Sequence, residues 1–158
     1  MGNDENRENL EQKIKKLQLL YAAALADAVY YYGSEGVLEK VTKHKKNNQL
    51  ENCKTLAARF EMTEPKHAFE KTRDMYGCAD WICQDTDTGF TAIAKRCMLC
   101  SISQSMGNFC PCQIFCLSPI EAALNGIVPD SEFNIISTLW NSGECKVKII
   151  LRGLNEGN

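Results

Sequence analysis

The spacing of apolar residues near the N-terminus predicts a long amphipathic helix. Apolar side chains recur there at steps of three and four residues, which places them on one helical face. The members of this stripe are Leu10, Ile14, Leu17, Tyr21, Ala24 and Ala28. Gly33 is expected to end the helix, because glycine readily adopts the left-handed conformation of a helix C-terminus.

Three further helices are predicted before residue 78. Ser34 is the expected N-cap of a helix over about residues 35–46, whose lysines near the end suit a helix C-terminus and are expected to face solvent. Leu50, Leu56 and Phe60 indicate another helix. A fourth is expected over residues 65–76, with proline at its first position and glycine directly after it.

The apolar pattern of the second half predicts strands and one helix. Residues 81–84 and 90–102 are expected to pair about a turn at 85–89, and residues 133–140 and 145–151 about a turn at 141–143. Because successive side chains of a strand point to opposite faces, we expect Cys145 to face the core and Lys146 to face solvent. Between the hairpins, Ser118 and the following proline begin a helix, and Gly126 is expected to end it.

Length and composition indicate one globular domain. The chain has 158 residues, of which 44% are hydrophobic and 24% are charged. We expect a single domain over residues 1–158, with a helical layer (1–77) and a cysteine-rich sheet layer (78–158). The net charge of −2 argues against nucleic acid as a partner. A polar N-terminus and the absence of a long apolar run predict a cytoplasmic protein without a membrane partner.

The nine cysteines are the unusual feature of the composition. In a reducing compartment, clustered thiols more often bind metals or act in catalysis than form disulfides. Five of them fall within twenty residues, at Cys97, Cys100, Cys110, Cys112 and Cys116. These five are the candidate ligands of a zinc ion or an iron–sulfur cluster, with Cys145 as a further ligand.

This metal hypothesis has one structural requirement and one alternative. Cys97 and Cys100 would face opposite sides of a regular strand, so both can bind one ion only if the chain bends between them. The alternative is that the thiols are small buried apolar groups, which we prefer for Cys53, Cys78 and Cys83. With only two histidines in the chain, a histidine base is scarce.

The C-terminal run Ser137-Thr138-Leu139-Trp140-Asn141-Ser142-Gly143-Glu144-Cys145-Lys146-Val147 resembles the terminal signature of the L-2-amino-thiazoline-4-carboxylic acid hydrolase-like family. The related 4-vinyl reductase domains end similarly and have cysteines suspected of binding zinc. The resemblance implies an α+β fold. In this fold the N-terminal helices pack on one face of an antiparallel sheet, a helix precedes the C-terminal hairpin, and a small-molecule pocket lies between the layers.

Two main functions follow from these observations. The first is a hydrolase-like enzyme that acts on a C–N bond of a small cyclic amidine or thiazoline-type metabolite. Its candidate catalytic thiols are Cys100, Cys116 and Cys145, and Arg96 is the candidate ligand of a substrate carboxylate. The second is a non-catalytic metal-binding or redox-sensing module. A third hypothesis makes the helical half a homodimer surface of a ligand-binding adaptor.

Overall fold

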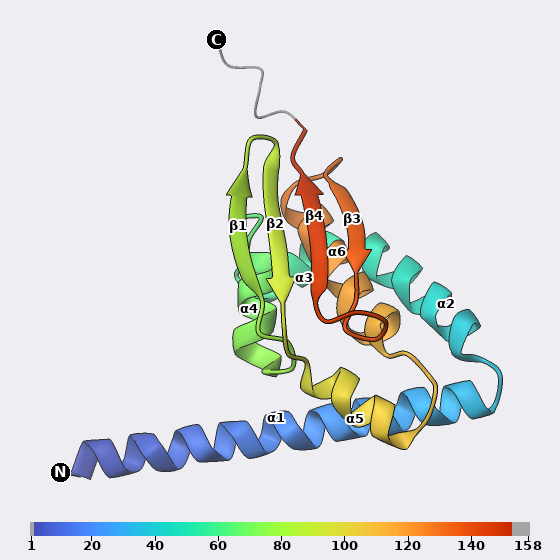
Figure 1. The fold of residues 1–158 in the computed structure, drawn as a ribbon. Helices are drawn as coiled ribbons and strands as arrows, with labels where there is room; N and C mark the ends of the chain where they lie inside the picture. The colour runs from blue at the N-terminus through green and yellow to red at the C-terminus, as the bar shows by residue number, and fades with distance from the viewer. Residues whose placement is uncertain (1, 153–158) are drawn as a thin grey trace.

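The computed structural model describes residues 2–152 and has an α+β fold, with helices on one face of a four-stranded antiparallel sheet (Figure 1). The first half contains four helices, α1 (Gly2–Ser34), α2 (Leu38–Glu51), α3 (Cys53–Arg59) and α4 (His67–Tyr76). The second half contains β1 (Ile82–Thr86), β2 (Gly89–Ala94), α5 (Met98–Met106), a π-helical turn (Gln113–Leu117), α6 (Ser118–Ile127), β3 (Glu132–Ser137) and β4 (Cys145–Ile150). The predicted fold class is therefore confirmed.

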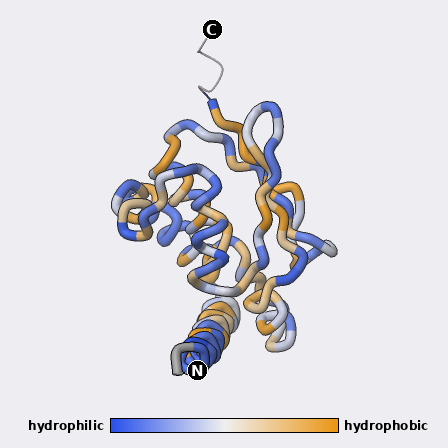
Figure 2. Tube along the Cα trace, turned by 90° about the vertical axis from the view of Figure 1, so that its left-hand side faces the viewer, coloured by the Kyte–Doolittle hydropathy of each residue, from blue (hydrophilic) through white to orange (hydrophobic). Residues whose placement is uncertain are grey.

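The sheet has the strand order β1-β2-β4-β3, so the two hairpins meet along β2 and β4. The inward faces of these central strands are buried and consist of Phe90, Ala92 and Ala94 on β2 and Cys145, Val147 and Ile149 on β4. Figure 2 shows the sheet nearly edge-on, with the helical layer on one side and α1 below both. The predicted inward orientation of Cys145 is confirmed, since its neighbour Lys146 is only partly buried and Lys148 is exposed.

An aromatic cluster joins the helical layer to the sheet. Phe69 of α4 is fully buried and makes edge-to-face contacts with Trp81 and Phe90, at ring-centroid distances of 5.2 and 5.8 Å. It also stacks on Phe133 of β3 at 6.0 Å. Such contacts add to the apolar area that these large side chains remove from water. Phe69 therefore anchors α4 to both hairpins.

Two predictions about the first helix are wrong. Gly33 does not end it, because α1 continues through Ser34 and the left-handed residue is Gly36, with a φ of 72°. Ser34 does not cap α2 either: its hydroxyl donates to the carbonyl oxygen of Tyr30, and Val37 occupies the N-cap position. Gly33 instead accommodates the ring of Phe109, which would lie 2.2 Å from an added Cβ.

The predicted apolar stripe of α1 does not face the core. Leu10 and Leu17 are 59% and 65% exposed, and the N-terminal part of α1 extends away from the rest of the protein (Figure 1). The face that packs against α5 consists of the smaller residues Ala22, Ala26 and Val29. Small side chains allow the two helix backbones to approach closely, so the larger stripe is left outward.

The strand predicted over residues 90–102 is also wrong in its second half. β2 ends at Ala94, and α5 begins at Met98 with Cys97 as its N-cap. The chain turns because the Asp80 carboxylate accepts hydrogen bonds from the backbone N–H groups of Lys95 and Arg96, both at 2.9 Å. Cys97 and Cys100 therefore lie at the N-cap and in the first turn of a helix, so they do not face opposite sides of a strand, as the metal hypothesis requires.

The helix predicted before the C-terminal hairpin is confirmed as α6, with different ends. It follows the π-helical turn directly, and the Ser118 hydroxyl bonds to the Gln113 side chain instead of capping the helix. Gly126 does not end α6, which continues to Ile127. Its role is close packing, because an added Cβ would lie 2.2 Å from the carbonyl oxygen of Cys53.

None of the helices in residues 2–152 combines the length and apolarity needed to cross a bilayer.

Candidate functional site

Seven of the nine cysteines gather where α5, the segment before the π-helical turn and the start of β4 meet. They come from distant parts of the sequence, and each interacts electrostatically or by hydrogen bonds with at least one other thiol of the group. The group consists of Cys78, Cys97, Cys100, Cys110, Cys112, Cys116 and Cys145. Cys53 and Cys83 lie elsewhere, on α3 and β1.

The centre of this group is a triad of thiols formed by Cys100, Cys110 and Cys112. Cys100 lies in the first turn of α5 and is 3% exposed. Cys110 and Cys112 flank the fully buried Pro111 in the segment that leads into the π-helical turn. The thiol of Cys112 adjoins those of Cys100 and Cys110 and can donate its one proton to either. We refer to these three residues as the thiol triad.

The hydrogen bonds divide the triad into one proton donor and two thiolate candidates. The hydrogen bond from Cys112 lowers the pKa of Cys110 to about 7, against the opposing effect of burial. The same donor lowers the pKa of Cys100 below its ordinary value. The pKa of Cys112 is correspondingly raised, because its proton stabilises whichever of its two neighbours is ionised. Since the thiolate is the nucleophilic form of cysteine, the triad holds a reactive sulfur near neutral pH.

Cys97 and Cys145 border the triad in their protonated form. The Cys97 sulfur accepts the backbone N–H of Cys100 at 3.4 Å, and burial raises the pKa of Cys97 to about 12. The Cys145 sulfur accepts the backbone N–H of Leu139 at 3.3 Å, and burial likewise raises its pKa. Both sulfurs therefore hold backbone segments in place around the triad.

Cys116 lies apart from the triad, although we expected it to act with Cys100. Its neighbours are Cys97, Cys145 and Cys78, and the indole N–H of Trp81 faces its sulfur. Burial raises the pKa of Cys116 well above the ordinary value. The structure thus brings together Cys100, Cys110 and Cys112, with Cys97 and Cys145 beside them, and places Cys116 behind this group.

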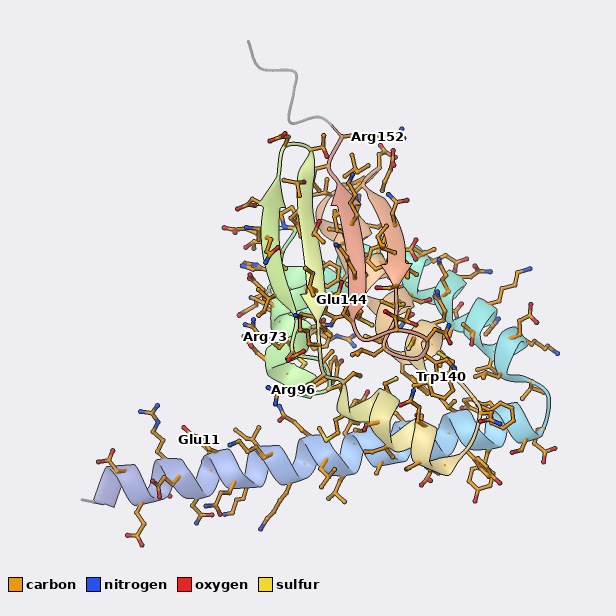
Figure 3. The ribbon with its side chains drawn as sticks, viewed as in Figure 1. Glu11, Arg73, Arg96, Trp140, Glu144 and Arg152 are labelled. Atoms are coloured by element: carbon orange, nitrogen blue, oxygen red, sulfur yellow. The ribbon has the colours of Figure 1, made fainter. Side chains whose placement is uncertain are left out.

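An open groove of about 630 Å³ lies beside the triad and includes Cys78, Cys97 and Cys100 in its wall. Three cationic side chains line it, from Arg73 of α4 and from Lys95 and Arg96 after β2. Figure 3 shows Arg73 and Arg96 at the same end of the sheet, near α5. The one carboxylate in the wall is that of Asp80, so the groove carries a net positive charge. A cationic groove of this size suits a small anionic ligand.

Arg96, which we predicted to bind a substrate carboxylate, lies in this wall, and most of its side chain is exposed to solvent. Its side chain is 89% exposed and contacts Asp80 at a distance of 3.4 Å between Nε and Oδ2. Burial raises the pKa of Asp80, but the backbone N–H groups of Arg96 and Lys95 outweigh burial and lower it overall. Asp80 is therefore ionised and orients Arg96 toward the groove.

Sequence reasoning missed Arg73 and Lys95 as groove residues, since nothing in the local pattern links α4 to the end of β2. Neither of the two histidines is among the residues that line the groove. His44 is exposed on α2. The Nδ1 atom of His67 accepts the backbone N–H groups of Thr63 and Glu64, which holds the segment before α4 and leaves the ring away from the thiols.

The thiols are chemically suited to a soft metal ion, because thiolate ligands select zinc and iron–sulfur clusters. Cys97, Cys100, Cys110 and Cys112 are the residues that would hold such a group. In residues 4–152, however, no three side chains of His, Cys, Asp or Glu are already placed around one ion position.

Comparisons with known proteins add no assignment: no family model, no curated protein and no solved structure matches the chain.

Proposed function

We propose that the protein is a thiol-dependent, hydrolase-like enzyme of the L-2-amino-thiazoline-4-carboxylic acid hydrolase-like type. Its substrate is a small cyclic amidine or thiazoline-type metabolite that carries a carboxylate. The observation that supports this proposal best is that Cys100, whose pKa is lowered, borders a groove lined by three cations. The C-terminal resemblance, which includes Cys145, supplies the substrate class.

The proposed reaction uses Cys100 as the nucleophile. Its thiolate adds to the amidine carbon, and the bond from that carbon to nitrogen breaks as the nitrogen takes a proton from water in the groove. The hydroxide left by this proton transfer then attacks the same carbon, and the bond from that carbon to the Cys100 sulfur breaks, which releases the product and returns the thiolate. Cys112 stabilises the attacking thiolate by donating its hydrogen bond. Arg96 holds the substrate carboxylate, because a guanidinium can bind both of its oxygens.

Cys116 and Cys145 have structural roles in this proposal. Both thiols have raised pKa values and so retain their protons at neutral pH. Cys145 fixes the turn between β3 and β4 through Leu139, and Cys116 packs against Trp81.

Turnover of 2-amino-thiazoline-4-carboxylate, followed by mass spectrometry, tests the proposal. We expect the wild-type protein to open the ring and the Cys100→Ala variant to lose activity. Arg96→Gln is expected to raise KM about three- to tenfold with little change in kcat, because an exposed charged contact contributes modestly to binding. Cys53→Ala, which removes a remote thiol, is the matched control and should remain fully active. Full activity of Cys100→Ala, or an inactive wild type, would refute the assignment.

A second candidate function is a zinc or iron–sulfur centre, or a redox sensor, at the same thiols. It is favoured by the direct contacts of Cys112 with Cys100 and Cys110, because adjacent thiols bind soft ions and form disulfides. Elemental analysis and the visible spectrum of anaerobically purified protein distinguish the cases. Stoichiometric zinc or iron would support this function, and metal-free thiols would support the enzyme.

Reduced thiols also suit the cytoplasm, where we propose that the protein resides.

We further propose that the outward stripe of α1 forms a homodimer interface. Its positions alternate at steps of four and three residues, the spacing by which one helix packs against an identical one. The exposed large side chains are Leu10, Ile14 and Leu17, whereas Tyr21 at the end of the stripe stacks on Tyr76 of α4. Glu11 and Lys13 flank them, as charged residues flank the seam of a coiled coil. A different face of α1 packs against α5, so the stripe from Leu10 to Leu17 is open to a second copy.

Leu17→Glu is expected to convert the dimer to a monomer, because it buries a carboxylate in the apolar seam of both copies. Sedimentation equilibrium or light scattering would show the mass fall by about half. Gln12→Glu adds the same charge to α1 outside the stripe and should leave the dimer intact. A wild-type monomer at every accessible concentration would contradict the proposal.

A further inference from the structure

A second, more enclosed cavity lies behind the groove, between the helical layer and Trp81. Its volume is about 110 Å³, and it shares Arg73, Cys78, Ala79 and Cys97 with the wall of the groove. Its polar lining includes Lys45 and Gln49 of α2, Trp81 before β1 and Cys116 of the π-helical turn, and the shared Arg73 is already paired with Asp74. We call this cavity the inner chamber.

The inner chamber contains a cation without a carboxylate partner. The Lys45 ammonium donates to the backbone carbonyl oxygen of Ile114 at 3.1 Å and lies 4.6 Å from the ring centroid of Phe115. No ion pair joins it to an acidic residue in the described part of the chain, whereas the adjacent Lys46 pairs with Glu121. Because burial disfavours the charged form, it lowers the pKa of Lys45. A half-buried cation without a carboxylate partner can bind the negative charge of an anionic ligand.

Two further polar groups at the chamber lack the partners that buried groups normally have. The Gln49 side-chain oxygen and the Trp81 indole nitrogen are buried without a hydrogen bond in the described structure. Trp81 is fully buried, and only the Cys116 thiol faces its N–H group. Buried polar atoms are nearly always satisfied by protein, water or ligand. The chamber therefore presents an unmatched acceptor from Gln49 and the N–H group of Trp81, whose one neighbour is the weakly accepting sulfur of Cys116, together with the charge of Lys45.

The π-helical turn explains why these groups meet. Its wider winding carries the Ile114 carbonyl, Phe115 and Cys116 to the chamber, immediately before α6 begins. Interruptions of this type cost helix stability and are frequent at functional sites. The Lys45 ammonium group reaches this turn, because it donates to the carbonyl oxygen of Ile114.

We infer that the inner chamber binds a small zwitterion of the α-amino acid class. Lys45 and Trp81 match an anionic carboxylate, and the Gln49 oxygen matches an ammonium donor. A water molecule occupies about 30 Å³ in the liquid, so the chamber of about 110 Å³ has room for roughly three to four waters. Covalently bonded atoms lie closer together than water molecules, so a compound as small as glycine fits this volume. This site is separate from the chemistry proposed for Cys100 and does not depend on it.

Trp81 provides a direct reporter for this inference, because Trp140 is the only other tryptophan. In a Trp140→Phe background, titration with glycine should give a saturable change in Trp81 fluorescence. Acetate, which lacks the ammonium group, and methylammonium, which lacks the carboxylate, should bind at least tenfold more weakly. Binding of acetate or methylammonium as tight as that of glycine would overturn the zwitterion assignment, as would the absence of a saturable glycine signal in the millimolar range.

Variants on α2 locate the site. Lys45→Met and Gln49→Met should each weaken glycine binding at least tenfold in the Trp140→Phe protein. Lys43→Met removes an exposed lysine from the same helix and should have no effect. Equal weakening by Lys43→Met, or wild-type binding in both chamber variants, would overturn the inference. Far-UV circular dichroism checks the fold of each variant. These results are independent of the turnover assay that tests Cys100.

Discussion

Replacing Cys112 with alanine is expected to shift the pH dependence of Cys110 alkylation from a midpoint of about 7 toward 9. The reason is that the Cys112 thiol donates the hydrogen bond that stabilises the Cys110 thiolate, and its removal leaves only the backbone N–H of residue 112 to oppose burial, which favours the neutral thiol. In the wild type, the iodoacetamide rate should rise about tenfold between about pH 6 and pH 8, since a thiol with pKa 7 changes from about one-tenth to nine-tenths ionised. In the variant, the rate should rise nearly a hundredfold over the same range.

Mass spectrometry of the Cys110 peptide measures both profiles. Cys112→Ser retains a donor of similar size, so its midpoint should lie between those of the wild type and Cys112→Ala. Cys53→Ala should reproduce the wild-type profile because that thiol lies on α3, away from the triad. An identical midpoint in the wild type and Cys112→Ala would show that Cys112 does not control the thiolate.

Phe69→Ala is expected to lower the free energy of unfolding by about 3–5 kcal/mol, the usual loss for a buried phenylalanine. Phe69 is completely buried and contacts aromatic rings from three other segments, so its removal leaves a cavity that they cannot fill without moving. Urea unfolding followed by circular dichroism measures the change.

Ile82→Thr is the control for this stability prediction. Ile82 is 62% exposed on β1, and threonine retains the branching that strands favour. We expect its free energy of unfolding to stay within about 0.5 kcal/mol of the wild type. A loss for Phe69→Ala as small as that of the control would mean that α4 does not pack on the sheet as the structure shows.

Local patterns were sufficient to predict most elements of the fold. Gly77 has a φ of 64° and ends α4 as expected, because the left-handed C-cap is a local property of glycine. The alternation along β4 likewise predicted the burial of Cys145 correctly. Both signals act within a few residues, so no knowledge of the tertiary structure was needed.

The errors have tertiary causes. Residues 90–102 are apolar enough for one strand, and the turn at Lys95 depends on the distant carboxylate of Asp80. For α1, helical periodicity identified an apolar face but not its partner. The core selected the narrower face of Ala22 and Ala26, because close packing against α5 favours small side chains.

The cysteines of the candidate site could be identified from the sequence, but their arrangement in space could not. Cysteine spacing singled out Cys97, Cys100, Cys110, Cys112 and Cys116, and the structure places the first four of these thiols together. Spacing could not show that the Cys112 thiol adjoins both other members of the triad while Cys116 lies behind them. Lys45 was missed for a related reason: among neighbouring lysines it resembles a solvated helix end, and only the contact with Ile114 reveals its position.

The central claim is that a thiolate of the triad borders a groove that attracts small carboxylates. The most direct test compares the alkylation of Cys100 by iodoacetate and by neutral iodoacetamide in native, reduced protein. We predict that the ratio of the two rates exceeds that of free cysteine and falls toward it in the Arg96→Gln and Lys95→Gln variants. A ratio at or below that of free cysteine, or one that both variants leave unchanged, would contradict the account.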